Sequence, residues 1–89
     1  MASLAYQLMT TYDDLNRKAL QAESYDAAFA WSTCESSVNN IHHGRSPHDW
    51  IPQLKRMLTE LAAEADSAEA KAVYIEAQDY ADIALAEVS

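Results

Sequence analysis

The sequence predicts an all-α fold, a small antiparallel bundle of four helices in which residues 1–89 form a single helical-bundle domain. Three observations support it. One glycine and two prolines leave few positions that favour turns. Alanine, leucine, glutamate and glutamine, which favour helices, are abundant, whereas β-branched residues are few. Apolar residues recur at steps of three and four, the period of an amphipathic helix.

The first helix is predicted from Leu4 to Ala22, with Ser3 as its N-cap. Asp13 and Asp14 fall on the polar side, together with Arg17 and Lys18. The apolar stripe on the other side consists of Leu4, Leu8, Tyr12, Leu15, Ala19 and Ala22.

The second helix is predicted to open at Ser24 and to end before Gly44, where a left-handed residue would terminate it. Its stripe consists of Ala27, Trp31, Cys34, Val38 and Ile41. Tyr25 and Phe29 lie one turn apart on a second face of this helix. The pattern leaves open whether they pack on another helix or are exposed.

The first two predicted helices contain a local pattern of Tyr12 and Leu15 followed by Tyr25-Asp26-Ala27-Ala28. This pattern resembles the helix–turn–helix of a tetratricopeptide repeat over roughly a third of the chain. Glu23-Ser24 stands where that repeat has a glycine before the tyrosine. The resemblance implies a helical hairpin and no function, because several such units must stack to form a repeat protein.

The third helix is predicted to start near Asp49, with Pro52 in its first turn, and its stripe is Ile51, Leu54, Leu58, Leu61 and Ala65. A break is predicted near Asp66-Ser67, because the apolar stripe changes direction there and Asp66 with Glu69 resembles a capping box. The fourth stripe is Val73, Ala77, Tyr80, Ala84 and Val88. The alternative is one long bent helix from Asp49 to the end, which would give a three-helix bundle.

Composition excludes several classes of function. Cys34 is the only cysteine, so no intramolecular disulfide can form. No stretch approaches the ~20 apolar residues of a membrane span, and no secretory signal is recognisable. The net charge of −8 provides no basic footprint for direct nucleic-acid or anionic-membrane binding. We therefore expect a cytoplasmic protein that contacts neither nucleic acid nor membrane.

Candidate ligand and nucleophile residues are His42, His43, His48 and Cys34. Adjacent side chains of a helix point about 100° apart, so His42 and His43 are poorly placed to share a metal. We interpret these histidines as complements to the C-terminal end of a helix and Cys34 as a buried packing residue. The sequence thus predicts no catalytic residue, no metal, no cofactor and no enzymatic activity.

The C-terminal third carries the most unusual feature, eight acids between Met57 and Ser89 against Lys71 alone. On the fourth helix, apolar residues are interspersed among these acids on the side away from the predicted core stripe. This pattern predicts a partner-binding face consisting of Glu69, Ile75, Glu76, Asp79, Asp82 and Ile83. The alternative is a solvated face that keeps a small bundle soluble.

The function predicted from these features is a non-enzymatic acidic protein-binding module that occludes a basic surface of a partner protein or nucleoprotein. In size, charge and lack of catalytic motifs the chain is similar to small phage-encoded inhibitors of bacterial defence, such as anti-CRISPR proteins, and to bacterial immunity proteins and antitoxins. That similarity implies an inhibitor acting in a bacterial host cell. The alternative is a homo-oligomeric structural or adaptor protein, for example a homodimer formed through Ile75 and Ile83.

Overall fold

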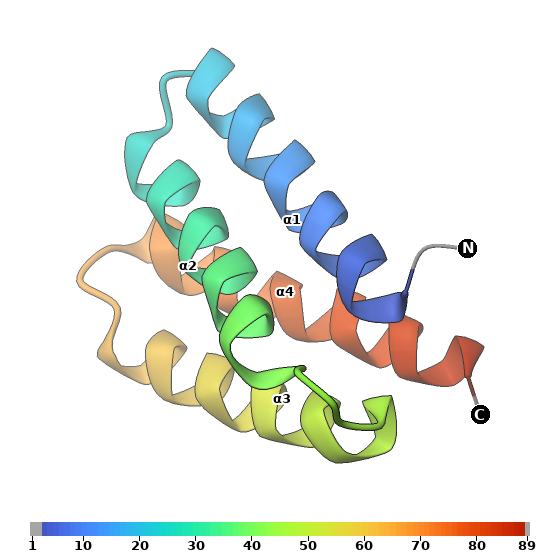
Figure 1. Ribbon diagram of the computed structural model, residues 1–89. Coiled ribbons are helices and arrows are strands. Elements are labelled where there is room, and N and C mark those ends of the chain that lie inside the picture. Colours follow the sequence, from blue (N-terminus) through green and yellow to red (C-terminus); the bar gives the residue numbers. More distant parts are fainter. Residues whose placement is uncertain (1–2, 89) are drawn as a thin grey trace.

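The computed structural model describes residues 3–88 and confirms the predicted all-α class. In this part of the chain four helices follow one another: α1 (Leu4–Gln21), α2 (Tyr25–Ile41), α3 (Pro47–Glu64) and α4 (Ala68–Glu87). Short connections make consecutive helices antiparallel, as Figure 1 shows. The helices α1 and α2 form one hairpin and α3 and α4 another, and the two hairpins meet mainly where α2 packs on α4.

The core lies between the two hairpins and is built around large side chains. Tyr12 of α1 packs against Trp31 of α2 with ring centroids 5.7 Å apart, and Tyr80 of α4 contacts both rings edge-on. The buried Tyr12 hydroxyl donates a hydrogen bond of 2.7 Å to the carbonyl oxygen of Ala77. This bond ties α1 to α4 and satisfies a polar group that would be costly to bury alone.

The predicted apolar stripes form the core in the middle of each helix. The largest fully buried side chains are Trp50, Tyr12, Ile51, Leu54, Leu58, Val38 and Cys34. The prediction is wrong for the last residue of the first and of the fourth stripe, because Ala22 is exposed and the side chain of Val88 is 42% exposed. Both residues lie just beyond a helix end, where no neighbouring helix covers the stripe.

The turn between α1 and α2 is closed by a Schellman motif. The Ser24 amide donates to the Ala19 carbonyl at 2.9 Å and the Glu23 amide to the Leu20 carbonyl at 3.0 Å. Glu23 adopts a left-handed φ of 58°, a conformation usually taken by glycine. Ser24 is the N-cap residue of α2 as predicted, although its side chain makes no capping hydrogen bond.

The predicted N-cap Ser3 is confirmed, whereas Gly44 is left-handed as predicted but does not cap α2, because the C-cap of this helix is His42. The Ser3 side chain accepts a hydrogen bond of 3.1 Å from the Tyr6 amide at the start of α1. After α2 ends at Ile41, Gly44 takes a left-handed φ of 64°. Arg45 then holds the α2–α3 connection by donating to the Ile41 carbonyl and to Gln53 Oε1.

The predicted start of α3 near Asp49 is wrong, because the helix begins at Pro47. Ser46 is the N-cap and accepts a hydrogen bond of 3.3 Å from the His48 amide. Proline suits the first helical position, since no intrahelical acceptor exists there for an amide. Pro52 consequently lies inside the helix, beyond its first turn, where it cannot donate to the His48 carbonyl.

The predicted break between the third and fourth helices is confirmed, and the single long bent helix is wrong. Ala65 leaves the helical conformation with a ψ of 135°, and α4 begins at Ala68. The residue that caps α4 is Ser67 rather than Asp66. Its side chain accepts a hydrogen bond of 3.1 Å from the Ala70 amide.

Candidate protein-binding surface

The outward face of α4 presents all six residues predicted to bind a partner. Val73, Ala77, Ala81 and Ala84 turn α4 towards the core, and the opposite side of the helix faces solvent. Glu69, Ile75, Glu76, Asp79, Asp82 and Ile83 are all exposed. The side chains of Ile75 and Ile83 are 50% and 57% exposed, so that two large aliphatic groups lie among the acids of this face.

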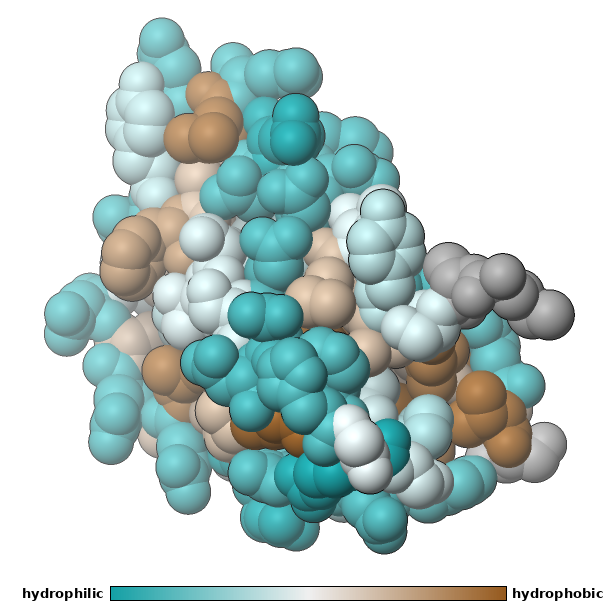
Figure 2. Space-filling model, viewed as in Figure 1, coloured by the Kyte–Doolittle hydropathy of each residue, from teal (hydrophilic) through white to brown (hydrophobic). Residues whose placement is uncertain are grey.

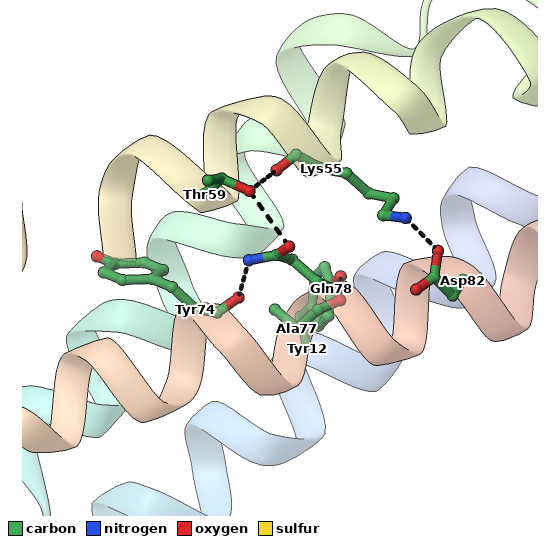
Figure 3. Close-up of polar contacts among 7 residues, drawn as sticks. All are labelled: Tyr12, Lys55, Thr59, Tyr74, Ala77, Gln78 and Asp82. Atoms are coloured by element: carbon green, nitrogen blue, oxygen red, sulfur yellow. Dashed lines mark hydrogen bonds and ion pairs between the residues drawn. The ribbon is translucent and has the colours of Figure 1, made fainter. Parts of the chain in front are cut away.

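One of the predicted acids already has an intramolecular partner. Asp82 pairs with Lys55 of α3 at 2.5 Å, and both side chains remain partly exposed (Figure 3). One turn away, the Thr59 hydroxyl lies 3.2 Å from Gln78 Oε1. These contacts attach one edge of the α4 face to α3. Asp82 is thus at the margin of the face, with its charge largely compensated.

The other acids of the face differ in what they do for the fold. Glu69 is in the first turn of α4, where its carboxylate stabilises the positive end of the helix dipole. Glu76 and Asp79 lie in the middle of the helix and have no ion-pair partner within the part of the chain that the structure describes. Their charges are therefore the ones most fully available to a partner.

Tyr25 and Phe29, whose placement the sequence left open, are both exposed. Tyr25 retains 64% of its exposure and Phe29 retains 73%. They lie one turn apart near the start of α2, and Phe29 lines a hollow together with Ala70 and Tyr74 of α4. The structure therefore adds a second apolar surface that the helical pattern alone did not assign.

Of the three candidate histidines, His42 packs at the junction of α2 and α3, whereas His43 and His48 are exposed. His42 Nδ1 lies 2.8 Å from the Val38 carbonyl oxygen, and its ring contacts Trp50 edge-on. The rings of His42 and His43 lie 4.3 Å apart rather than diverging, because α2 ends at Ile41 and both residues follow it. Among residues 3–88, no group of three or more potential ligands is placed to hold a metal ion.

Cys34 is fully buried between the two hairpins, as its position on the α2 stripe predicts. Burial raises the pKa of its thiol to about 12, because the thiolate would lose its hydration. The thiol is thus neutral at physiological pH and shielded from solvent, both of which oppose a role as nucleophile.

Two further findings concern the apolar length of the helices and the similarity of the chain to known proteins. None of the helices within residues 3–88 is long and apolar enough to cross a lipid bilayer. Comparison of the chain with protein-family models, with curated proteins and with solved structures found no match. The function of the chain is therefore inferred from the chemistry of its surface.

Proposed function

We propose that this protein is a non-enzymatic binding module whose α4 face engages a basic surface of a partner protein or nucleoprotein. The observation that carries the proposal is the outward side of α4. There Ile75 and Ile83 are half or more exposed, and Glu76 and Asp79 lie between them without an ion-pair partner in the described chain. Apolar side chains set among uncompensated charges of one sign are typical of a surface that becomes buried on association.

The two kinds of side chain would contribute differently. Uncompensated carboxylates attract a basic partner over distances of about a Debye length and raise the association rate. Ile75 and Ile83 are two helical turns apart, about 12 Å along the axis, so together they span a contact patch. Their burial would stabilise the complex after the encounter and slow its dissociation.

The mode of action we propose is occlusion of a cationic cleft on a bacterial protein, which requires no catalytic residue in the inhibitor. A homodimer through the same face is less favoured. Each chain carries a net charge of −8, so face-to-face pairing would bring the acids of two α4 helices together.

The test begins with capture of partners from a bacterial lysate by the tagged chain, followed by binding measurements with the purified partner. The double variant I75A/I83A should raise Kd at least about tenfold, mainly through faster dissociation. The control is Tyr6→Ala on α1, which removes a side chain with 60% exposure elsewhere on the surface. Equal losses in the two variants, or recovery of the chain with itself alone, would contradict the proposal.

A further inference from the structure

A hollow of about 380 Å³ is lined in part by the first turns of α4 and opens between the start of α2 and the end of α3. These two helices are joined by a short connection at one end and diverge towards the other, as the left side of Figure 1 shows. Phe29, Leu61 and Tyr74 supply large apolar side chains to its lining, and Asp26, Glu64 and Asp66 supply carboxylates. The volume lies within the range of ligand sites, about 300–1,000 Å³.

The apolar part of the hollow continues onto the surface. Phe29 is the most exposed large apolar side chain of the described chain, at 73%, and Tyr25 lies one turn before it. Figure 2 shows apolar atoms at the left edge of the molecule, where α2 starts and α3 ends, beside hydrophilic ones. This surface extends beyond the hollow itself, which favours a peptide over a small molecule as its occupant.

The carboxylates of the hollow lack cationic partners among residues 3–88. Asp26 has a local structural role, because it lies in the first turn of α2, where its carboxylate stabilises the positive end of the helix dipole. Glu64 has no such role. It is the last residue of α3, where free carbonyls and the helix dipole already favour a positive charge, and no basic residue lies in that turn. Asp66 follows two residues later and adds to the negative potential.

We infer that this hollow binds a basic peptide segment of the partner protein, with an arginine or lysine at the end of α3 and a neighbouring apolar side chain on Phe29. Glu64 and Asp66 would receive the cation through charge-assisted hydrogen bonds. The largely exposed ring of Phe29 would bury the neighbouring apolar side chain. This inference rests on the proposed function in one respect, that the partner is basic, but it concerns a different surface from the α4 face.

Charge decides between the occupants that an apolar, acid-lined hollow could take. A second copy of this chain would bring a net charge of −8 and only six basic residues, so self-association is opposed at low salt. An acidic peptide is opposed for the same reason. A basic partner gains from every unpaired carboxylate around the hollow.

The test uses the full-length ¹⁵N-labelled chain and a short capped peptide in which arginines alternate with leucines. Amide shifts should centre on Phe29, Leu61 and Tyr74. A peptide with glutamates in place of the arginines should produce none, and one with alanines in place of the leucines should bind several-fold more weakly. Shifts confined to the outward face of α4, or equal shifts with the glutamate peptide, would overturn the inference.

Matched variants then separate this hollow from the α4 face. The double variant E64K/D66K should raise Kd for the arginine–leucine peptide at least about tenfold, since it replaces two attractions with two repulsions. The double variant E76K/D79K carries the same change in charge and should alter Kd by no more than about twofold. If both pairs weaken the peptide equally, the hollow inference fails while the proposed α4 face stands. Suppose instead that only E64K/D66K raises Kd for the peptide and that E76K/D79K binds the captured partner as tightly as the wild type does. The proposal that the α4 face binds the partner is then wrong, whereas the hollow inference stands.

Phe29→Ala provides a readout that does not depend on charge or on refolding of the α3–α4 connection. The ring is largely exposed, so its removal should change the spectrum of the free protein only for residues around position 29 while raising Kd for the peptide several-fold. Sedimentation of the wild type and of this variant tests whether a second copy of this chain occupies the hollow instead. A dimer that Phe29→Ala dissociates would assign the hollow to a second copy and overturn the inference.

Discussion

Glu23 is a non-glycine residue held in a left-handed conformation, with φ 58° at the end of α1. The Schellman hydrogen bonds around it impose this conformation, which costs an L-residue about 1–2 kcal/mol. We predict that Glu23→Gly stabilises the protein by about 0.5–1 kcal/mol, measured as a higher urea midpoint at unchanged m. Glu60→Gly, at an exposed position inside α3, is the control and should destabilise by a similar amount. A lower midpoint for Glu23→Gly would contradict the assigned backbone.

Cys34 provides a second test at the level of one side chain. Because the thiol is fully buried and its pKa is raised by burial, it should react slowly with a thiol reagent in the native state and rapidly after denaturation. Reaction followed by mass spectrometry with and without urea measures both rates. Rapid labelling under native conditions would contradict the burial of Cys34 in the core.

The raised pKa of Cys34 also has a consequence for stability at alkaline pH. In the unfolded chain the thiol ionises near its ordinary value of 9.0, whereas in the fold its pKa is about 12. The native state therefore binds more protons above pH 9, so stability falls as pH rises, by up to about 1.4 kcal/mol per unit. Cys34→Ala should flatten this decline between pH 9 and pH 10. The burial that raises the pKa of Tyr12, whose ordinary value is 10.0, acts in the same direction at higher pH.

At the scale of the elements, α3 ends in a carboxylate that its own dipole disfavours. We predict that Glu64→Lys stabilises the protein by about 0.3–1 kcal/mol at low salt, since a cation suits the C-terminal end of a helix. Glu69→Lys, in the first turn of α4, should destabilise by a similar amount. Thermal unfolding at low and high salt measures both changes. Destabilisation by Glu64→Lys would show that this carboxylate already has a structural role.

The sequence predicts the elements well where periodicity carries the signal and less well where a single side chain decides. The stripes through Trp31, Cys34 and Leu58 correctly identify the faces that become buried. The predicted start of α3 is two residues late, because Pro52 favours a start near Asp49, whereas Pro47 itself suits the first helical position. The cap of α4 was misplaced by one residue, since both Asp66 and Ser67 are good capping types.

Contacts between elements were beyond prediction from a single sequence. The ion pair between Lys55 and Asp82 joins residues of two helices whose relative register depends on the α3–α4 connection. The sequence of α4 alone therefore does not show that Asp82 has a cationic partner. The pair is partly exposed, so it contributes about 0–1 kcal/mol to stability and serves mainly to define the edge of the α4 face.

At the scale of the whole molecule, the arrangement of the two hairpins produces surfaces that no stripe encodes. The hollow beside Phe29 exists because α2 and α3 diverge from their connection over α4. Helical periodicity shows only that Tyr25 and Phe29 lie off the core stripe. Their exposure depends on whether another helix packs on that side of α2, and within residues 3–88 none does. By contrast, the exposure of Ile75 and Ile83 was predicted, because the opposite side of α4 already carries a complete core stripe.

The central claim is that Glu76 and Asp79 steer association with a basic partner, and the salt dependence of the association rate constant tests it most directly. Stopped-flow measurements with the captured partner should show a slower rate for E76K/D79K than for the wild type, and a flatter decline as salt is added. The double variant D14K/E60K changes the net charge equally at exposed mid-helix positions of α1 and α3 and should retain most of the wild-type salt dependence. Identical rates and salt dependence in the two double variants would contradict the claim, because only the net charge of the molecule would then govern association.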